Sequence, residues 1–213
     1  LVNGACCFVC STKNLSDTNL LQDEIARVQP TIMQATPSTW TMLLHGGWRN
    51  PERLRVLCGG EPLSEGLKQQ LIDNASQVWN MFGPTETTIW STIGQLTQDG
   101  LPVNIGKPID RTQIYILDAA RALMPIGLPG ELYIAGEGLA KGYLNAPELT
   151  AEKFIDHPFR KGEKIYRTGD LARWRSDGVI EHLGRLDHQV KIHGYRIELG
   201  EIETWLERHQ AIR

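Results

Sequence analysis

The segment from Gly83 to Thr88 places one carboxylate among three hydroxyl groups, directly after an apolar stretch. It reads Gly83-Pro84-Thr85-Glu86-Thr87-Thr88. Hydroxyls and backbone amides suit phosphate oxygens, and a lone carboxylate beside them suits a Mg²⁺ ion that is shared with phosphate. An ordinary turn, whose threonines satisfy their own backbone, explains the same pattern equally well. The segment by itself therefore leaves a phosphate site and a plain turn open.

Two further loops are expected to lie beside this segment. From Ala5 to Met81 short apolar runs alternate with amphipathic stretches, which is typical of parallel strands joined by crossover helices. Ligands of open parallel sheets bind beyond the carboxyl ends of the strands. We therefore expect the loops 34–37, 59–62 and 82–88 to face one crevice. The pair Gly59-Gly60 would let the backbone come close to a ligand there.

The spacing of apolar residues predicts the elements of this first part. Strands are expected at 5–10, 31–34, 55–58 and 78–81, the first of them buried. Helices are expected around Leu20 to Val28, from the N-cap Thr36 to Gly46-Gly47, and after the N-cap Ser64. The sheet should be mostly parallel and doubly wound.

The pattern changes after Pro108. Apolar runs at 113–117, 131–135, 164–167, 179–182 and 189–192 alternate with Gly/Pro turns, which predicts an antiparallel subdomain. One helix, 147–155 behind the cap Asn145, interrupts it. After Asp187 two short strands precede a helix with an apolar face of Ile202, Trp205 and Leu206. The fold class is therefore α/β, with a mostly parallel sheet layer with helices (1–108), an antiparallel β-barrel-like subdomain (109–186) and the start of a small α+β C-terminal subdomain (187–213).

Composition limits the class of protein. The net charge of -3, with 41% hydrophobic and 22% charged residues, is ordinary for a globular protein and argues against a nucleic-acid partner. No apolar run reaches the roughly 18 residues of a membrane span. Three of the four cysteines, Cys6, Cys7 and Cys10, crowd into one apolar run, so we interpret them as buried small hydrophobes in a reducing, cytoplasmic setting. We expect a piece of a longer chain.

Four motifs occur in order along essentially the whole chain. They are 80–88 (NMFGPTETT), 130–134 through Gly142-Tyr143 (GELYI…GY), 166–170 (YRTGD), and 184–191 with 194–198 (GRLDHQVK…GYRIE). This set resembles the core motifs of nonribosomal peptide synthetase adenylation domains, and 198–203 resembles the acidic start of the family's next helix. The resemblance implies an enzyme that activates an amino acid with ATP, releases pyrophosphate, and passes the acyl group to the phosphopantetheine thiol of a carrier domain.

The resemblance also implies roles for individual residues at a nucleotide site. At the phosphate end, Glu86 matches the Mg²⁺-associated acid and Thr85 a phosphate contact. At the base, Asn80 matches the partner of the adenine amino group and Phe82 the aromatic wall beside adenine, while Gly60 and Gly83 fall beside the nucleotide. Asp170 matches the carboxylate that holds both ribose hydroxyls, Arg185 a ribose and phosphate contact, and Asp187 the hinge of the C-terminal subdomain. Thr85, Glu86 and Arg185 would act in the reaction itself. A vicinal diol needs two acceptor oxygens, which a carboxylate supplies.

The resemblance further implies which residues line the amino-acid pocket. They are Gln34, Leu57, Gly59, Met81, Ile89 and Trp90. Met81 and Trp90 are bulky, Gly59 leaves backbone exposed, and no ionic group is present to pair with a charged substrate. A small neutral side chain fits best, and the set resembles glycine-activating pockets.

Some expected parts of the family pattern are missing. The chain lacks the Ser/Thr/Gly/Lys-rich phosphate loop, the aspartate that anchors the substrate amino group, and the C-terminal lysine, so we expect a fragment that does not turn over alone. His193 stands where the family often has arginine, and the six histidines form no pair with metal-ligand spacing. A peptidyl carrier domain and a condensation domain in the same polypeptide are the expected partners.

Two alternative functions stay open at this point. A stand-alone acyl or aryl acid ligase of the same superfamily would share Thr85, Glu86, Asp170 and Arg185. A noncatalytic nucleotide-binding or interaction module would account for the missing phosphate loop and lysine.

Overall fold

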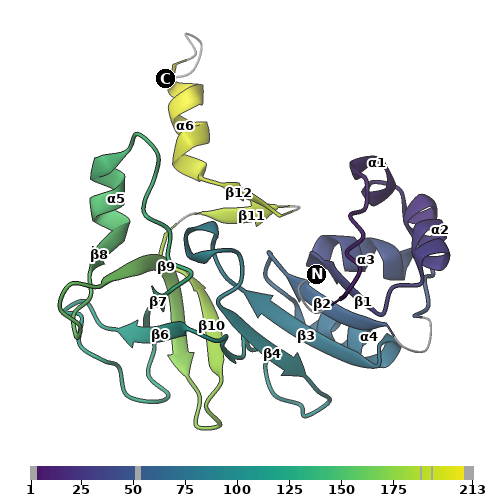
Figure 1. Cartoon of the computed structure of the whole chain (residues 1–213), viewed down its shortest axis with the longest axis horizontal. Helices are drawn as coiled ribbons and strands as arrows, with labels where there is room; N and C mark the ends of the chain where they lie inside the picture. Colours follow the sequence, from purple (N-terminus) through teal and green to yellow (C-terminus); the bar gives the residue numbers. More distant parts are fainter. Residues whose placement is uncertain (1–3, 51–53, 188, 193, 209–213) are drawn as a thin grey trace.

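The computed structural model describes residues 4–50, 54–187, 189–192 and 194–208, so His193 lies outside it. Two sheets lie side by side, and a short hairpin followed by a helix stands above them (Figure 1). Within these ranges no helix combines the length and the apolar character that a membrane crossing requires.

The first sheet contains five strands in sequence order. They are β1 (Ile32–Ala35), β2 (Arg55–Gly59), β3 (Gln77–Phe82), β4 (Thr92–Leu96) and β5 (Lys107–Pro108). The pairs β1/β2 and β2/β3 are parallel, whereas β3/β4 and β4/β5 are antiparallel. The predicted α/β class is confirmed, with a mixed sheet. The three parallel strands end at the same edge, beyond which the 3₁₀ turn η1 (Thr85–Thr87) follows β3.

Local sequence explains where the helices of this layer begin. They are α1 (Thr12–Leu15), α2 (Thr18–Val28), α3 (Pro37–His45) and α4 (Glu65–Asn74). The side chain of Asp17 accepts from the amides of Asn19 and Leu20 at the start of α2. Thr36 and Ser64 cap α3 and α4 as predicted, each by accepting from the amide three residues further along.

One hydrophobic core holds α2, α3 and α4 against the sheet. It contains Leu21 and Ile25 of α2, Trp40 and Leu43 of α3, and Leu67 and Leu71 of α4, together with the strand residues Val56, Cys58 and Val78. Right-handed crossovers that run β1-α3-β2 and β2-α4-β3 place α3 and α4 on the same face of the sheet. The helix α2, which precedes β1, packs into the same core. The expectation of a doubly wound sheet is therefore wrong for the described residues.

The second sheet is antiparallel and curls beside the first. Its strands are β6 (Thr112–Leu117), β7 (Gly130–Gly136), β8 (Phe154–Asp156), β9 (Lys164–Trp174) and β10 (Ile180–Arg185), in the order β10-β9-β7-β6 with β8 on β9. This matches the predicted barrel-like part, although β9 continues to Trp174 and not only to Arg167. Ile116, Leu132, Ile134 and Ile180 form its core.

The N-cap of α5 (Pro147–Lys153) is Ala146, so the prediction that Asn145 caps this helix is wrong. Asn145 has φ 55, and an N-cap residue needs extended backbone. The hydroxyl of Thr150 instead accepts from the Tyr143 amide at 2.9 Å and donates to the Ala146 carbonyl at 2.8 Å. The helix start is therefore tied to the loop before it.

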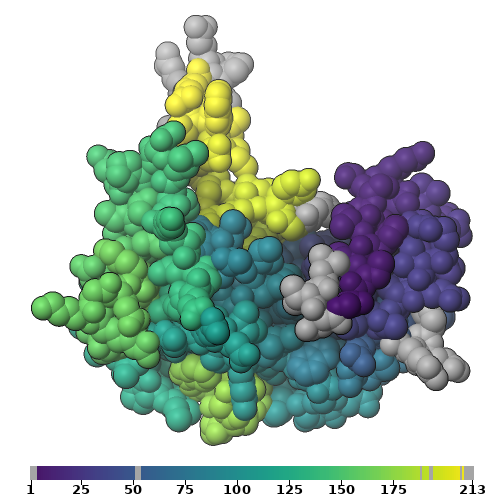
Figure 2. Space-filling model, viewed as in Figure 1, coloured from purple at the N-terminus to yellow at the C-terminus, as the bar shows by residue number. Residues whose placement is uncertain are grey.

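The C-terminal part consists of the hairpin β11 (Val190–Ile192) and β12 (Tyr195–Ile197) and of α6 (Leu199–Glu207). Figure 2 shows α6 projecting from the body of the molecule. Ile202, Trp205 and Leu206 are 46%, 65% and 49% exposed. The predicted apolar face of this helix is thus largely exposed.

The prediction of a buried strand at 5–10 is wrong. This segment has no regular secondary structure, and Phe8 and Val9 are exposed. In the described residues β1 is the edge of the sheet, and apolar composition alone does not supply the ladder that a strand needs. Cys6 and Cys7 are exposed as well, so only Cys58 is a buried small hydrophobe. Its burial, with the charge of Glu61, raises the pKa of the Cys58 thiol to about 12.

Candidate active site

The loops at the ends of β1, β2 and β3 meet as predicted. Glu61 accepts from both the amide and the hydroxyl of Ser38, at 3.0 and 2.7 Å, which ties the loop after β2 to the start of α3. A Cβ added to Gly60, whose φ is +91, would lie 3.7 Å from the Thr36 methyl group. The loops after β1 and β2 are therefore tied together at this sheet edge, next to the end of β3, whose strand is paired with β2.

Gly59 lies against the ring of Trp90 at this sheet edge. A Cβ at Gly59 would lie 2.4 Å from the Met81 carbonyl oxygen and 2.8 Å from two atoms of the Trp90 ring. The ring thus covers Gly59 and leaves no room for a side chain at that position. Gln34 and Leu57 are paired across β1 and β2 on the same edge.

Ile89 does not join this group. Its side chain is 61% exposed and its backbone has φ 71, a conformation that is strained for a β-branched residue. Of the six predicted lining positions, the structure brings Gly59, Met81 and Trp90 into contact.

The segment 83–88 is both a turn and a candidate site. The hydroxyl of Thr87 lies 2.6 Å from the hydroxyl of Ser91, and that of Thr88 donates to the Gly138 carbonyl at 2.7 Å. Gly83 is required because a Cβ there would lie 2.4 Å from the Ile89 carbonyl oxygen. Thr85, in contrast, is exposed. The fold therefore uses the hydroxyls of Thr87 and Thr88, whereas the hydroxyl of Thr85 makes no hydrogen bond among the described residues.

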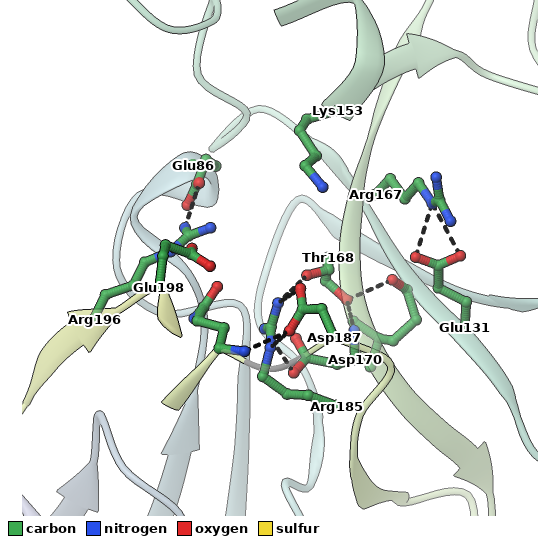
Figure 3. Close-up of polar contacts among 12 residues, drawn as sticks. Glu86, Glu131, Lys153, Arg167, Thr168, Asp170, Arg185, Asp187, Arg196 and Glu198 are labelled. Atoms are coloured by element: carbon green, nitrogen blue, oxygen red, sulfur yellow. Dashed lines mark hydrogen bonds and ion pairs between the residues drawn. The ribbon is translucent and has the colours of Figure 1, made fainter. Parts of the chain in front are cut away.

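Glu86 is a carboxylate that is only 5% exposed. Its Oε1 accepts from the Tyr143 hydroxyl at 2.5 Å. The same oxygen accepts from Nη1 of Arg196 at 2.7 Å (Figure 3). Burial would raise the pKa of Glu86, but the hydrogen bond from Tyr143 and the charge of Arg196 outweigh it, so the pKa is lowered. Burial and the same carboxylate raise the pKa of Tyr143 to about 12. Glu86 is therefore held as an anion.

The second oxygen of Glu86 fits a metal ion. Oε2 is buried and has no hydrogen-bond partner among the described residues. No cluster of three or more His, Cys, Asp or Glu side chains able to hold a metal occurs in the same part of the chain. A single carboxylate suits Mg²⁺, which usually keeps water and substrate phosphates as its other ligands. The residues present thus fit Mg²⁺ that arrives with a phosphate.

Asp170 is the second buried carboxylate, also 5% exposed, and it lies on β9. Its Oδ1 lies 3.0 Å from Nε2 of His182 and 3.1 Å from Nη1 of Arg185, both on β10. Its amide donates to the Thr168 hydroxyl at 2.9 Å, and that hydroxyl donates to the Leu132 carbonyl. Backbone and carboxylate are therefore both fixed by neighbouring strands.

Arg185 connects Asp170 to the predicted hinge. Nε and Nη2 of Arg185 each donate to Asp187 at 2.6 Å, and Nη2 also donates to the Thr168 carbonyl at 3.2 Å (Figure 3). The hydrogen bond from Arg185 lowers the pKa of Asp187. One guanidinium thus joins Asp170 on β9 to Asp187, at the start of the C-terminal part.

Phe82 and Asn80 both lie on β3, and Phe82 packs against His182, which contacts Asp170. The rings of Phe82 and His182 are 5.6 Å apart between centroids and inclined by 42°. Asn80 is buried, and its Nδ2 donates to the Asn104 carbonyl at 2.8 Å. Part of the Asn80 amide is therefore already used by the fold.

No role was predicted from the sequence for Tyr143, Tyr166, His182 or Arg196. Burial and the hydrogen bond with Tyr143 raise the pKa of Tyr166. Three of these four residues, Tyr143, Tyr166 and Arg196, belong to the motifs quoted above. Their place in the motifs was the available signal, while His182 had none.

Comparisons with known proteins identify a family of AMP-binding enzymes. The family model for AMP-binding enzymes matches residues 1–144. The chain is 47% identical over 215 residues to a dimodular nonribosomal peptide synthase of Bacillus subtilis, covering 100% of the chain and 9% of that protein. It is 44% identical over 219 residues to tyrocidine synthase 1 of Brevibacillus parabrevis, covering 100% of the chain and 20% of that protein.

Solved structures give the same result. A four-domain nonribosomal peptide synthetase bound to AMP and glycine matches with a TM-score of 0.79 at 43% identity, over 95% of this chain and 15% of that one. A Vibrio cholerae adenylation domain in complex with glycyl-adenosine-5′-phosphate matches with a TM-score of 0.79 at 34% identity, over 88% of this chain and 37% of that one. The chain belongs to the AMP-binding enzyme family of adenylate-forming ligases, in the branch of nonribosomal peptide synthetase adenylation domains. It spans a fifth or less of the two curated relatives named above.

Proposed function

We propose that the protein containing this chain activates glycine with ATP and transfers it to a carrier-domain thiol. In the first step a carboxylate oxygen of glycine attacks the α-phosphorus of ATP, the bond to the β-phosphate oxygen breaks, and pyrophosphate leaves. In the second step the phosphopantetheine thiolate attacks the carbonyl carbon of glycyl-AMP, and AMP leaves. The observation that carries the proposal is the pair of buried carboxylates, Glu86 on the turn after β3 and Asp170 on β9.

The chain's own residues would bind the nucleotide from three sides. Asp170 accepts the two ribose hydroxyls, because its carboxylate is held in place by His182 and Arg185. Phe82 covers one face of the adenine, and Arg185 is near enough to Asp170 to reach the phosphate that follows the ribose. These contacts orient the α-phosphorus for attack.

The phosphate end of the nucleotide would lie at Thr85 and Glu86. The exposed hydroxyl of Thr85 donates to a phosphate oxygen. When bound, Mg²⁺ neutralises charge on the leaving pyrophosphate. Glu86 would hold it through the buried Oε2.

The amino-acid pocket is proposed to accept glycine because Trp90 occupies the space above Gly59. A substrate with a larger side chain would meet the indole ring, whereas glycine needs no such space. Two structural relatives support this choice, since one is bound to AMP and glycine and the other to glycyl-adenosine-5′-phosphate. Gln34, Leu57 and Met81 are proposed to complete the lining, whereas Ile89, which is 61% exposed, lies apart from them.

The partners proposed for the chain follow from the relatives. One solved relative contains adenylation and carrier domains in one protein, and another has four domains. We propose a peptidyl carrier domain as the acceptor and a condensation domain in the same polypeptide. Asp187 is proposed as the hinge between the parts 109–186 and 187–213, and 1–108 as the end of the large α/β subdomain.

Amino-acid-dependent ATP–pyrophosphate exchange on the full-length protein tests this function. We expect exchange with glycine, weaker exchange with alanine, and none with leucine or glutamate. Gly59→Ala should lower exchange with glycine by about tenfold or more, since the added methyl group clashes with Trp90 and the Met81 carbonyl. Gly66→Ala on α4 is the matched control, because a Cβ there meets no atom within 4 Å.

Two results would count against the proposal. Exchange only with a large or charged amino acid would remove glycine as the substrate and leave amino-acid activation in place. No exchange with any amino acid, in a protein that is folded, would remove the activity as well.

A further inference from the structure

His182 lies between the proposed ribose carboxylate and the proposed adenine wall. Its Nε2 is 3.0 Å from Oδ1 of Asp170, and its ring is 5.6 Å from that of Phe82 between centroids. The His182 side chain is 24% exposed and that of Asp170 is 8% exposed. Because a carboxylate only accepts hydrogen bonds, this contact requires a proton on Nε2.

We propose that His182 is a positioning residue that fixes the carboxylate of Asp170 in the orientation in which it accepts the two ribose hydroxyls. The inference rests on the proposed function of Asp170. The terminal torsion of an aspartate side chain is soft. Two donors on Oδ1, from His182 and Arg185, restrict that torsion. No hydrogen bond to Oδ2 occurs among the described residues, so both lone-pair sites of this oxygen stay open to the two ribose hydroxyls.

A bulge in β10 brings both donors to the same oxygen. The register pairs His182 with Ala172 but Arg185 with Asp170, because one extra residue is inserted between His182 and Gly184. Without that insertion Gly184 would stand opposite Asp170, and Arg185 would point to the other face of the sheet. Bulges commonly re-aim a side chain beside a functional site. Here the bulge places Arg185 on the face that His182 occupies.

Arg185 alone would fix Asp170 less well. It also donates to Asp187 and to the Thr168 carbonyl, and Asp187 is the proposed hinge. A movement at Asp187 therefore acts directly on Arg185. His182, in contrast, belongs to a strand paired with β9 and packs against Phe82. It keeps its contact with Asp170 when the hinge changes.

Two variants separate the hydrogen bond from the packing of the ring. His182→Phe keeps a ring against Phe82 and removes the donor. His182→Gln keeps an amide nitrogen near the place of Nε2. Both are compared with wild type in the full-length protein by glycine-dependent ATP–pyrophosphate exchange, with ATP and with 2′-deoxy-ATP as the nucleotide.

We expect His182→Phe to raise the KM for ATP by about tenfold, the effect of one hydrogen bond to a charged group. The preference for ATP over 2′-deoxy-ATP should fall with it, because an unfixed carboxylate no longer distinguishes the diol. The KM for glycine should not change. His182→Gln should restore both nucleotide properties to within about threefold of wild type. On an Asp170→Asn background, His182→Phe should add no further effect.

Three outcomes would overturn the inference. The first is an unchanged ATP preference in His182→Phe, which would leave the ring as packing only. The second is an equal rise in the KM for glycine, and the third is a His182→Gln variant as impaired as His182→Phe. If His182→Phe does not fold, His182→Asn, which is too short to reach Oδ1, replaces it in the same comparison. Loss of exchange with every amino acid in wild type would instead refute the proposed function.

Discussion

Glu86 and Asp170 are equally buried, yet they are held in different ways. The donors to Asp170 lie on β10, the strand paired with its own strand β9. The donors to Glu86 are Tyr143 and Arg196, which follow it in the sequence by 57 and 110 positions. Glu86 itself lies on a 3₁₀ turn. Sheet register fixes the first carboxylate, whereas the second depends on two segments that are distant from it in the sequence.

This difference matches the two proposed roles. A ribose diol has the same geometry in every step of the reaction, so a rigid carboxylate is suited to it. Pyrophosphate leaves halfway through, and a carboxylate that serves it has to exchange partners. Arg196 belongs to β12, beyond the proposed hinge Asp187, and it donates to the oxygen of Glu86 adjacent to the one that fits Mg²⁺. The hairpin can therefore supply a positive charge when the metal is gone.

Removing the rigid carboxylate should have the largest effect. Asp170→Ala deletes the acceptor for the ribose and leaves Arg185 and His182 without it. We expect kcat/KM for ATP in the exchange assay to fall by at least about a hundredfold, the loss of two charge-assisted hydrogen bonds. Asp177→Ala, on the exposed turn before β10, is the matched control and should behave as wild type. An active Asp170→Ala protein would contradict the role assigned to this strand.

Separating the hairpin from Glu86 should have a smaller effect. Arg196→Ala removes the contact between β12 and the turn η1. We expect trypsin to cut the segment around Lys191 about five times faster, because a partly exposed charged pair contributes on the order of 1 kcal/mol. Arg208→Ala, at the exposed residue directly after α6, serves as the control. Equal cutting rates in wild type and Arg196→Ala would show that the pair does not hold the hairpin.

The Tyr143 hydroxyl should contribute about as much to the free energy of unfolding as the pair of Arg196 and Glu86 does. Tyr143→Phe removes one donor to a buried carboxylate, so the free energy of unfolding in urea should fall by about 1–2 kcal/mol. Tyr195→Phe removes the hydroxyl of a tyrosine that is 74% exposed, and it should leave the unfolding midpoint unchanged. A loss of stability in Tyr143→Phe that is no larger than the loss in this control would mean that Glu86 does not need the tyrosine.

The smallest expected effect is a change of stability with pH. The pKa of Glu86 is lowered in the folded state from an ordinary value of 4.5, so its ionised form contributes stability that is fully present above about pH 4.5. This contribution is lost as pH falls through the lowered folded pKa. Urea unfolding between pH 3 and 7 should therefore show a stability difference between wild type and Glu86→Gln that is constant near neutral pH and shrinks in acid. A difference that grows in acid would have the wrong sign.

The elements that sequence predicts well are those with a local cause. Thr36 and Ser64 were found because a capping side chain acts within three residues. The segment 5–10 was wrongly predicted because its apolar side chains say nothing about whether a strand pairs with it. The cap at Asn145 failed because its left-handed backbone is set by the surrounding loop.

The candidate site divides in the same way. The motifs identified Glu86, Asp170 and Arg185, and the structure brings the last two together. They did not reveal His182, whose relation to Asp170 depends on a bulge, or the contact between Arg196 and Glu86 over 110 residues. Such pairings follow from the tertiary fold and not from local spacing. The roles of all these residues stay predictions until measured.

The most direct measurement compares the two carboxylates in one assay. Glycine-dependent ATP–pyrophosphate exchange is measured while Mg²⁺ is varied at fixed ATP and ATP is varied at fixed Mg²⁺, in wild type, Glu86→Gln and Asp170→Asn. The division of roles predicts that Glu86→Gln raises the Mg²⁺ concentration needed for half-maximal exchange and keeps the preference for ATP over 2′-deoxy-ATP. Asp170→Asn should lose that preference and keep the Mg²⁺ dependence. The same change in both titrations for both variants would contradict it.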